Sequence, residues 1–151
     1  IRIGDNPNYH AFVFAGGSSV FNHVLLDCDF GEGVEYNDVY WEHTSSLSNY
    51  SIQWTLTVEA NPGAEVRITD RFGNSAYTGS AGSDGTLSTP LTQSIIRPVE
   101  WTEDSKQVYV NKKFVHQEEV FFPYSITVKS DGKEKTESFD MNKKYNLDMR
   151  F

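Results

Sequence analysis

Short stretches of alternating apolar and polar residues recur along the chain, and clusters of Gly, Pro, Asn, Asp and Ser separate them. Alternation with a period of two places successive side chains on opposite faces of a strand, so it predicts β-strands. No useful apolar run has the spacing i, i+3, i+4, i+7 of a helix. We therefore predict an all-β fold. The expected strands are His10–Phe14, His23–Phe30, Val34–Trp41, Ile52–Glu59, Glu65–Asp70, Ser75–Thr78, Leu91–Arg97, Gln107–Val110, Glu119–Phe122, Tyr124–Lys129, Lys135–Phe139 and Tyr145–Phe151.

Three turn motifs predict hairpins between these strands. Asn61-Pro62-Gly63 suits a type II turn, because Pro fixes φ at the first central position and Gly accepts a positive φ at the second. Phe72-Gly73-Asn74 suits a hairpin loop with Gly in the left-handed conformation. Asp131-Gly132 is a hairpin signal between two alternating stretches. Many short strands with such turns are typical of a sandwich or a barrel.

The N-terminal third of the chain differs from the rest. It is rich in aromatic and acidic residues and alternates less strictly, and the polar run Thr44–Ser51 separates it from the regular strands. A chain of 151 residues is long enough for one buried core with a small appendage. We predict two parts: an acidic β-rich extension over residues 1–51 and a β-sandwich domain over residues 52–151.

The C-terminal two-thirds resembles a known class of modules. The stretches "LTVEANPGAEVRITDRFGNSAYTGSAGSDGT" and "PYSITVKSDGKEKTESFDMNKKYNLDMRF" are similar to carboxypeptidase-regulatory-like, or prealbumin-like, modules of secreted and cell-surface proteins. The resemblance implies an antiparallel Ig/prealbumin-like β-sandwich and an extracellular or cell-surface location. The chain departs from the pattern by having Asp84 alone where the family has an Asp-x-Asp-Gly turn, and by the long stretch "RPVEWTEDSKQVYVNKKFVHQEE".

Residues 10–43 resemble a different architecture. The stretch "SSVFNHVLLDCDF" is similar to the last coils of a right-handed parallel β-helix. Fewer than three such coils cannot bury their own faces. The resemblance therefore implies that this segment packs on the sandwich, on a partner, or on an upstream part of a longer protein.

The net charge of −8 is concentrated in one part of the chain. Residues 1–66 hold nine acidic residues and one arginine, whereas residues 67–151 hold twelve acidic and twelve basic residues. An acidic surface repels phosphate backbones and anionic lipids, so we expect no nucleic-acid partner. No apolar run approaches the length that would span a bilayer, so we expect no membrane insertion.

Carboxylates cluster in the extension. Asp27 and Asp29 are two positions apart, so a strand would project both from one face. Clustered carboxylate and carbonyl oxygens suit Ca²⁺, whereas a carboxylate pair at a fixed separation suits glycoside hydrolysis. A solvated acidic face is the third interpretation, and the sequence leaves all three open. The candidate calcium ligands are Asp27, Asp29, Glu32, Glu35 and Asp38.

Tyr36, Tyr40 and Trp41 lie among these acids. Exposed aromatic rings beside hydrogen-bonding acids form sugar-binding faces, because a ring offers apolar area with few rotamers to restrict. The alternative is that these side chains alternate into the core. We therefore take the three residues as candidate polysaccharide contacts, with core packing as the competing interpretation.

No catalytic motif is present in the sequence. The histidines have no metal-ligand spacing, the serines lack a G-x-S-x-G elbow, and "AGGSS" lacks the lysine of a phosphate-binding loop. We expect a protein that is not an enzyme and has no cofactor other than calcium. The expected function is that of a structural or adhesive extracellular module. The alternative is a carbohydrate-binding or accessory module of a secreted polysaccharide-active β-helix protein.

The two ends of the chain indicate how such a module would associate. Tyr145, Leu147, Met149 and Phe151 alternate as one face of a final strand, and the chain opens on Ile1-Arg2-Ile3. An unpaired strand invites another chain to add a strand, so we expect pairing with a second copy or another surface protein, extending to a filament. The alternative is that each end pairs within its own sandwich.

Overall fold

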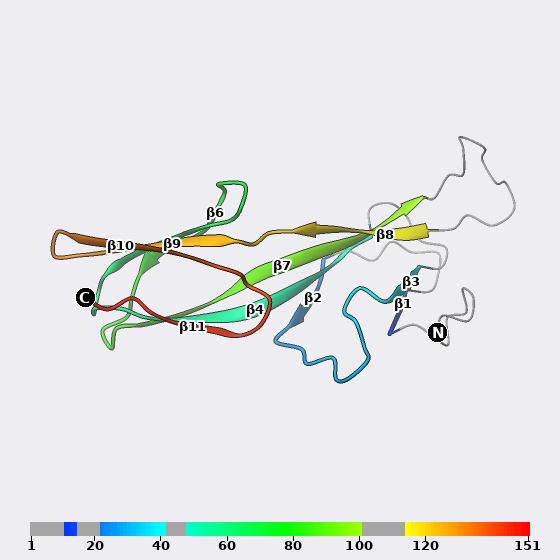
Figure 1. The fold of residues 1–151 in the computed structure, drawn as a ribbon, viewed down its shortest axis with the longest axis horizontal. Coiled ribbons are helices and arrows are strands. Elements are labelled where there is room, and N and C mark those ends of the chain that lie inside the picture. Colours follow the sequence, from blue (N-terminus) through cyan, green and yellow to red (C-terminus); the bar gives the residue numbers. More distant parts are fainter. Residues whose placement is uncertain (1–10, 15–21, 42–47, 101–113) are drawn as a thin grey trace, which may run out of the picture. The chain divides into compact units, whose positions relative to one another are not determined.

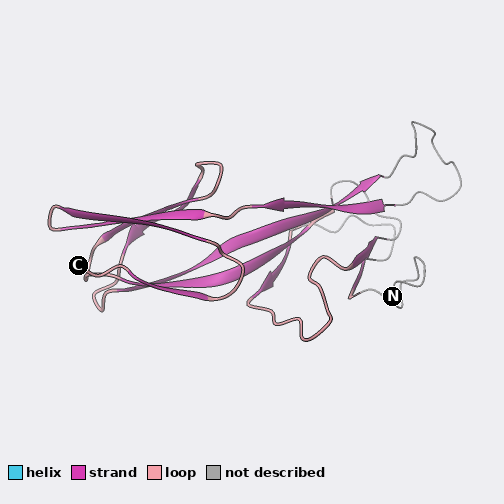
Figure 2. Ribbon diagram, in the orientation of Figure 1, coloured by secondary structure: helices cyan, strands magenta, loops and turns pink. Residues whose placement is uncertain are grey.

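The computed structural model describes residues 11–14, 22–41, 48–100 and 114–151. These residues form strands, turns and irregular segments, and none of them is helical (Figures 1 and 2). The all-β, sandwich-like fold that the sequence predicts is confirmed. The strands are β1 (Phe12–Phe14), β2 (His23–Leu26), β3 (Val39–Trp41), β4 (Tyr50–Glu59), β5 (Glu65–Thr69), β6 (Ser75–Ser80), β7 (Thr86–Glu100), β8 (Phe114–Val120), β9 (Tyr124–Ser130), β10 (Lys133–Phe139) and β11 (Tyr145–Asp148).

The chain divides into two compact units. The first unit comprises residues 1–52 and 95–119, and the second unit comprises residues 53–94 and 120–151. Strands β4, β7 and β8 each contribute residues to both units. The predicted boundary at residue 52 is not tested by this division and stays a prediction.

One sheet of the second unit is antiparallel, with the order β10-β9-β5-β6. The type II turn expected at Asn61-Pro62-Gly63 forms, since the N–H of Ala64 donates to the carbonyl of Asn61 at 3.0 Å and Gly63 has φ 72°. The hairpin expected there is wrong, because this turn connects β4 of one sheet to β5 of the other. At the β9–β10 hairpin, Ser130 pairs with Lys133 across Asp131 and Gly132, both of which have positive φ.

The other sheet has the order β11-β4-β7-β8, and β2 also pairs with β4. Here the structure differs from the antiparallel expectation, because β11 pairs with β4 in parallel, with Tyr145 opposite Leu56 and Asp148 opposite Glu59. The reason is topological: the chain leaves one sheet after β10 and enters the other sheet at β11. A short two-stranded sheet, β1 with β3, is also parallel.

The core of the second unit is formed by alternate residues from both sheets. In β9 every second side chain from Tyr124 to Val128 is buried. The same alternation is seen at the end of β4 and along β5. Burial of apolar side chains by the two sheets together is what defines a sandwich. The buried cluster consists of Leu56, Val58, Ala60, Ala64, Val66, Ile68, Ala81, Leu91, Tyr124, Ile126, Val128, Phe139, Met141 and Met149.

Several strand boundaries differ from the predicted ones. The strand expected over His23–Phe30 ends at Leu26, where Asp27 takes a positive φ of 53°. The strand expected over Val34–Trp41 is limited to β3, because a turn at residues 36–37 interrupts it. The strand expected over Leu91–Arg97 is longer, since β7 runs through Pro90 and Pro98. The strand expected over Gln107–Val110 lies outside the described residues.

Candidate functional site

Aromatic side chains pack together in the first unit. The ring of Phe12 lies 5.9 Å from that of Phe30 and 5.7 Å from that of Tyr50. Trp41 lies 5.9 Å from Tyr50, and Tyr36 lies 6.4 Å from Phe30. These separations are those of interacting aromatic pairs. We call these five residues the aromatic cluster.

Hydrogen bonds tie the aromatic cluster to a distant part of the sequence. The hydroxyl of Tyr36 donates to Oε1 of Glu118 at 2.6 Å, and the hydroxyl of Tyr50 donates to the carbonyl of Tyr36 at 2.7 Å. Burial raises the pKa of the Tyr50 hydroxyl well above its usual range, and the negative charges of Glu118 and Asp38 raise it further. Tyr50 therefore stays protonated at neutral pH and acts as a hydrogen-bond donor.

The three aromatic residues proposed for sugar binding have different environments. The Trp41 side chain is only 5% exposed and packs on Tyr50. Tyr36 and Tyr40 are half-buried. A sugar-binding platform needs an open ring face, so Tyr36 and Tyr40 are better placed for this role than Trp41.

The candidate calcium ligands all lie outside the strands, since β2 ends at Leu26 and β3 begins at Val39. Oδ1 of Asp29 accepts a hydrogen bond from the N–H of Gly31 at 3.1 Å, and Oδ2 of Asp38 accepts one from the N–H of Ala11 at 3.4 Å. Asp27 is half-buried, whereas Glu32 and Glu35 are exposed. Asp27 and Asp29 therefore do not lie on a common strand.

Within the described ranges, no three His, Cys, Asp or Glu side chains lie close enough to hold a metal ion. Ca²⁺ also takes carbonyl oxygens, so calcium binding by this segment stays a prediction.

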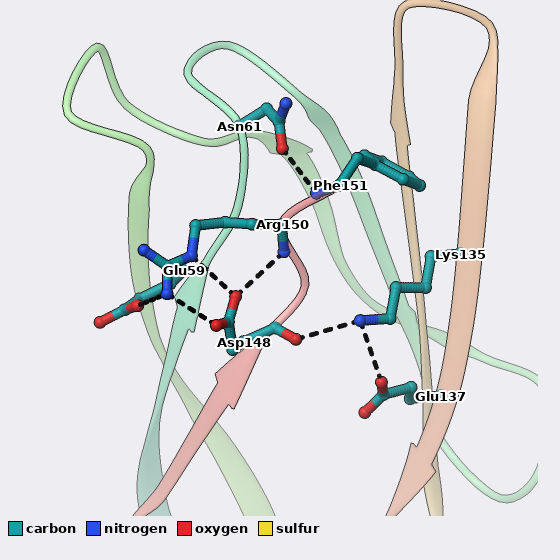
Figure 3. Close-up of polar contacts among 7 residues, drawn as sticks. All are labelled: Glu59, Asn61, Lys135, Glu137, Asp148, Arg150 and Phe151. Atoms are coloured by element: carbon teal, nitrogen blue, oxygen red, sulfur yellow. Dashed lines mark hydrogen bonds and ion pairs between the residues drawn. The ribbon is translucent and has the colours of Figure 1, made fainter.

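A second polar group of residues surrounds the end of β11 (Figure 3). Nε and Nη2 of Arg150 donate to the two carboxylate oxygens of Asp148 at 2.8 and 2.7 Å, and Nη2 lies 3.2 Å from Oε2 of Glu59. The bonds from Arg150 hold the pKa of the Asp148 carboxyl well below its usual range. We call Glu59, Asp148 and Arg150 the C-terminal clasp.

Further contacts hold the residues on either side of the C-terminal clasp. Nζ of Lys135, on β10, donates to the carbonyl of Asp148 at 3.2 Å and lies 3.4 Å from Oε1 of Glu137. The N–H of Phe151 donates to Oδ1 of Asn61 at 3.0 Å (Figure 3). A lysine side chain from one sheet thus satisfies a carbonyl at the edge of the other sheet.

Two of these hydrogen-bonded pairs, Asp148 with Arg150 and Tyr36 with Glu118, were not predicted from the sequence. Asp148 and Arg150 are two positions apart in a strand pattern, so their pairing was available from the period of two. No local signal links Tyr36 to Glu118, which lies 82 positions later.

Asp84, which departs from the family motif described above, has a structural role at a turn. Its carboxylate accepts hydrogen bonds from the N–H and the hydroxyl of Thr86 at 2.9 and 2.8 Å, so it stabilises the turn before β7.

The described part of the chain includes no helix that could cross a membrane. No protein-family model and no curated protein matches the chain.

Proposed function

We propose that the protein is a non-catalytic structural or adhesive module of the extracellular space or cell surface, which associates through its terminal strand. One observation supports this most directly: β11 is an edge strand that pairs with β4 over four residues, in parallel. A short edge strand joined to one neighbour is the element most easily exchanged between copies.

The contacts of β11 favour exchange over permanent attachment. The C-terminal clasp is exposed to solvent, with 58% of the Arg150 side chain and 57% of the Asp148 side chain accessible. Exposed ion pairs contribute little stability, since water and salt screen them. Met149 is fully buried, and Leu147 and Tyr145 are partly buried against the core, so these three side chains supply the apolar anchorage. A β11 strand from a second copy would make the same contacts with β4.

A pair of cysteines placed across β11 and β4 tests this exchange. Asn146 and Thr57 are register partners, so Asn146→Cys with Thr57→Cys brings two thiols to disulfide distance. Oxidation at high protein concentration should give covalent dimers and larger species on a non-reducing gel if β11 is exchanged. Intrachain crosslinks alone would contradict the proposal.

A matched control uses register partners within one hairpin. Thr127→Cys with Thr136→Cys places the same pair of thiols on β9 and β10. Because a tight turn connects these strands, this variant should form intrachain disulfides only. Cys28 is replaced by Ser in both variants so that it does not contribute.

A second candidate function is that of a carbohydrate-binding or accessory module of a secreted polysaccharide-active β-helix protein. Two observations favour it. The parallel pairing of β1 with β3 is the contact that successive β-helix coils make, and Val24 and Leu26 of β2 are 50% and 46% exposed, as a coil without its neighbour would be. Affinity electrophoresis in gels containing soluble polysaccharides should then retard the protein. Tyr40→Ala should abolish the retardation, whereas Phe72→Ala, on an exposed turn of the second unit, should not.

Calcium is the one cofactor we propose, held by backbone carbonyls together with at most two of the carboxylates of Asp27, Asp29, Glu32, Glu35 and Asp38, because no three of these described residues lie close enough to share an ion. A ligand that binds only the native state raises its melting temperature. Millimolar Ca²⁺ added to chelator-treated protein should therefore raise the melting temperature, and Mg²⁺ should do so less. An unchanged melting temperature would exclude the site.

A further inference from the structure

Strand β6 forms an edge of the antiparallel sheet in the second unit. In the part of the chain that the structure describes, it pairs with β5 alone (Figure 1). Its residues, Ser-Ala-Tyr-Thr-Gly-Ser, include no charged side chain and no proline, and four of the six are exposed. Natural edge strands usually avoid pairing with other chains by carrying charges, prolines or bulges, or by being covered. A bulge at Ala76 lies near the start of β6, and the outer edge has none of these protections over the last four residues, Tyr77 to Ser80.

Two other edges of the second unit differ from β6 in this respect. Strand β10 carries four charged residues among seven, and Glu134 pairs with Lys129 at 3.0 Å. At the edge of β11, the backbone carbonyl of Asp148 accepts a hydrogen bond from Nζ of Lys135. Charged side chains thus guard β10 and β11, whereas β6 carries none.

The register of β6 on β5 identifies which backbone groups face outward. In an antiparallel pair, a residue directs both its N–H and its C=O either toward the neighbouring strand or away from it, and successive residues alternate. The N–H of Ala81 donates to the carbonyl of Ala64 at 2.9 Å, so Gly79 and Tyr77 also face β5. Thr78 and Ser80 therefore direct their N–H and C=O groups to the outer edge, whereas the bulge at Ala76 interrupts the alternation.

We propose that two copies of the chain join through the end of β6, antiparallel and related by a two-fold axis at Gly79. In this arrangement Thr78 meets Ser80 of the second copy, and Ser80 meets its Thr78. Each of these residues exchanges both backbone hydrogen bonds with its partner. The side chains that meet on the exposed face are small and uncharged, and a threonine–serine pair across strands is favourable. The sequence of β6 is thus self-complementary.

The distribution of charge supports a second copy as the occupant of this edge. Residues 53–94 and 120–151, which form the second unit, hold nine acidic and eight basic residues, a net charge of −1. The first unit holds twelve acidic and five basic residues, a net charge of −7. Two copies therefore meet with little repulsion at the second unit, and β6 lies in that unit.

This contact is separate from the exchange of β11, since the two strands lie in different sheets. Sedimentation velocity of the full chain over a concentration series tests it. The chain should form a dimer, and Thr78→Lys should weaken dimerisation by on the order of tenfold or more, because the two lysines are then diagonal neighbours across the two-fold axis and repel each other. Added salt should restore part of the affinity of this variant, since it screens the repulsion.

Thr136→Lys is the matched control, because it adds the same charge to an exposed threonine of β10, at the opposite edge of the same sheet. It should leave the dimer unchanged. Thr78→Pro is a second variant that removes the outward N–H without removing a bond to β5, and it should also abolish dimerisation. Circular dichroism establishes that each variant is folded.

The β6 contact is overturned if the full chain sediments as a monomer at every concentration, or if both Thr78 variants dimerise as the unaltered chain does. The Asn146→Cys, Thr57→Cys chain, oxidised when dilute so that β11 is locked in its own sandwich, should still dimerise. Loss of dimers in this locked chain would assign the association to β11 and would contradict a β6 contact.

Discussion

The two units are stabilised by different kinds of contact. The buried cluster of the second unit consists mainly of aliphatic side chains and methionines from both sheets. The aromatic cluster of the first unit consists of rings, of which Tyr36 and Tyr50 also form hydrogen bonds. Aliphatic packing depends on the area removed from water, whereas buried polar groups are stabilising only when their hydrogen bonds are satisfied. The first unit should therefore be the more sensitive to single polar changes and to pH.

Two isoleucines provide the largest test of this difference. Ile126 of the second unit and Ile96 of the first unit are both fully buried. Ile126→Ala should lower the free energy of unfolding by about 2–5 kcal/mol, because it leaves a cavity in a packed aliphatic core. We expect Ile96→Ala to destabilise mainly the first unit. Hydrogen exchange measured segment by segment would locate the loss of protection in each variant.

The two alanine variants should thus affect different sets of amide protons. Ile126→Ala should speed exchange in β5 and β9, and Ile96→Ala should leave those strands protected. Equal loss of protection throughout the chain in both variants would mean that the two units unfold as one, and would remove the distinction between them.

Two tyrosines give a closer comparison with a smaller effect. Tyr50 donates to the carbonyl of Tyr36 at 2.7 Å in the first unit, and Tyr124 donates to the carbonyl of Thr92 at 2.6 Å in the second. Replacing either by Phe leaves a carbonyl without its donor, at a cost of about 1–3 kcal/mol. Tyr50→Phe should lower the free energy of unfolding more than Tyr124→Phe, as measured by denaturant unfolding. The reason is that it removes the hydrogen bond that joins Tyr50 to the Tyr36–Glu118 pair. A greater loss for Tyr124→Phe would reverse the comparison.

The stability of the protein at alkaline pH gives a second comparison of Tyr50 and Tyr124. Burial raises the pKa of both hydroxyls above the usual value of about 10. The stabilisation from a raised pKa is fully present below the unfolded value and is lost as pH rises through the folded value. Stability should therefore fall progressively above about pH 10, by less in either Phe variant. A spectrophotometric titration in which all tyrosines ionise together near pH 10 in the folded protein would contradict this.

The smallest effect is expected at the C-terminal clasp. The lowered pKa of Asp148 adds stability above its usual pKa of about 3.9, and this stability is lost as pH falls below that value. The group is exposed, so the effect is small and decreases with salt. Asp148→Asn should flatten the acid side of the stability profile slightly at low salt. The same change at Asp131, on an exposed hairpin, is the control.

Local features of the fold followed from the sequence, and distant ones did not. The turn at Gly63 and the hairpin at Asp131 were predicted correctly, because φ preferences act within a few residues. The extent of β7 was underestimated because proline cannot donate to a ladder, although Pro90 and Pro98 both lie in the strand. The sequence singled out Tyr36 and Trp41 as candidate sugar contacts, but only tertiary structure brings Glu118 to Tyr36. The parallel pairing of β11 with β4 likewise depends on the order of strands, which alternation does not encode.

The pairing of β11 with β4 has a consequence for folding during synthesis. Asn61, just after β4, and Phe151, just after β11, are in contact although 90 positions separate them. Contacts between distant positions form slowly, because a long loop must close before they are made. During translation β4 emerges before β11, and its pairing with β11 cannot form until the strands between them have been made. A nascent chain therefore exposes the β4 edge to its neighbours on the same messenger RNA, so the spacing of ribosomes and the rate of translation should govern how much of the product misassembles.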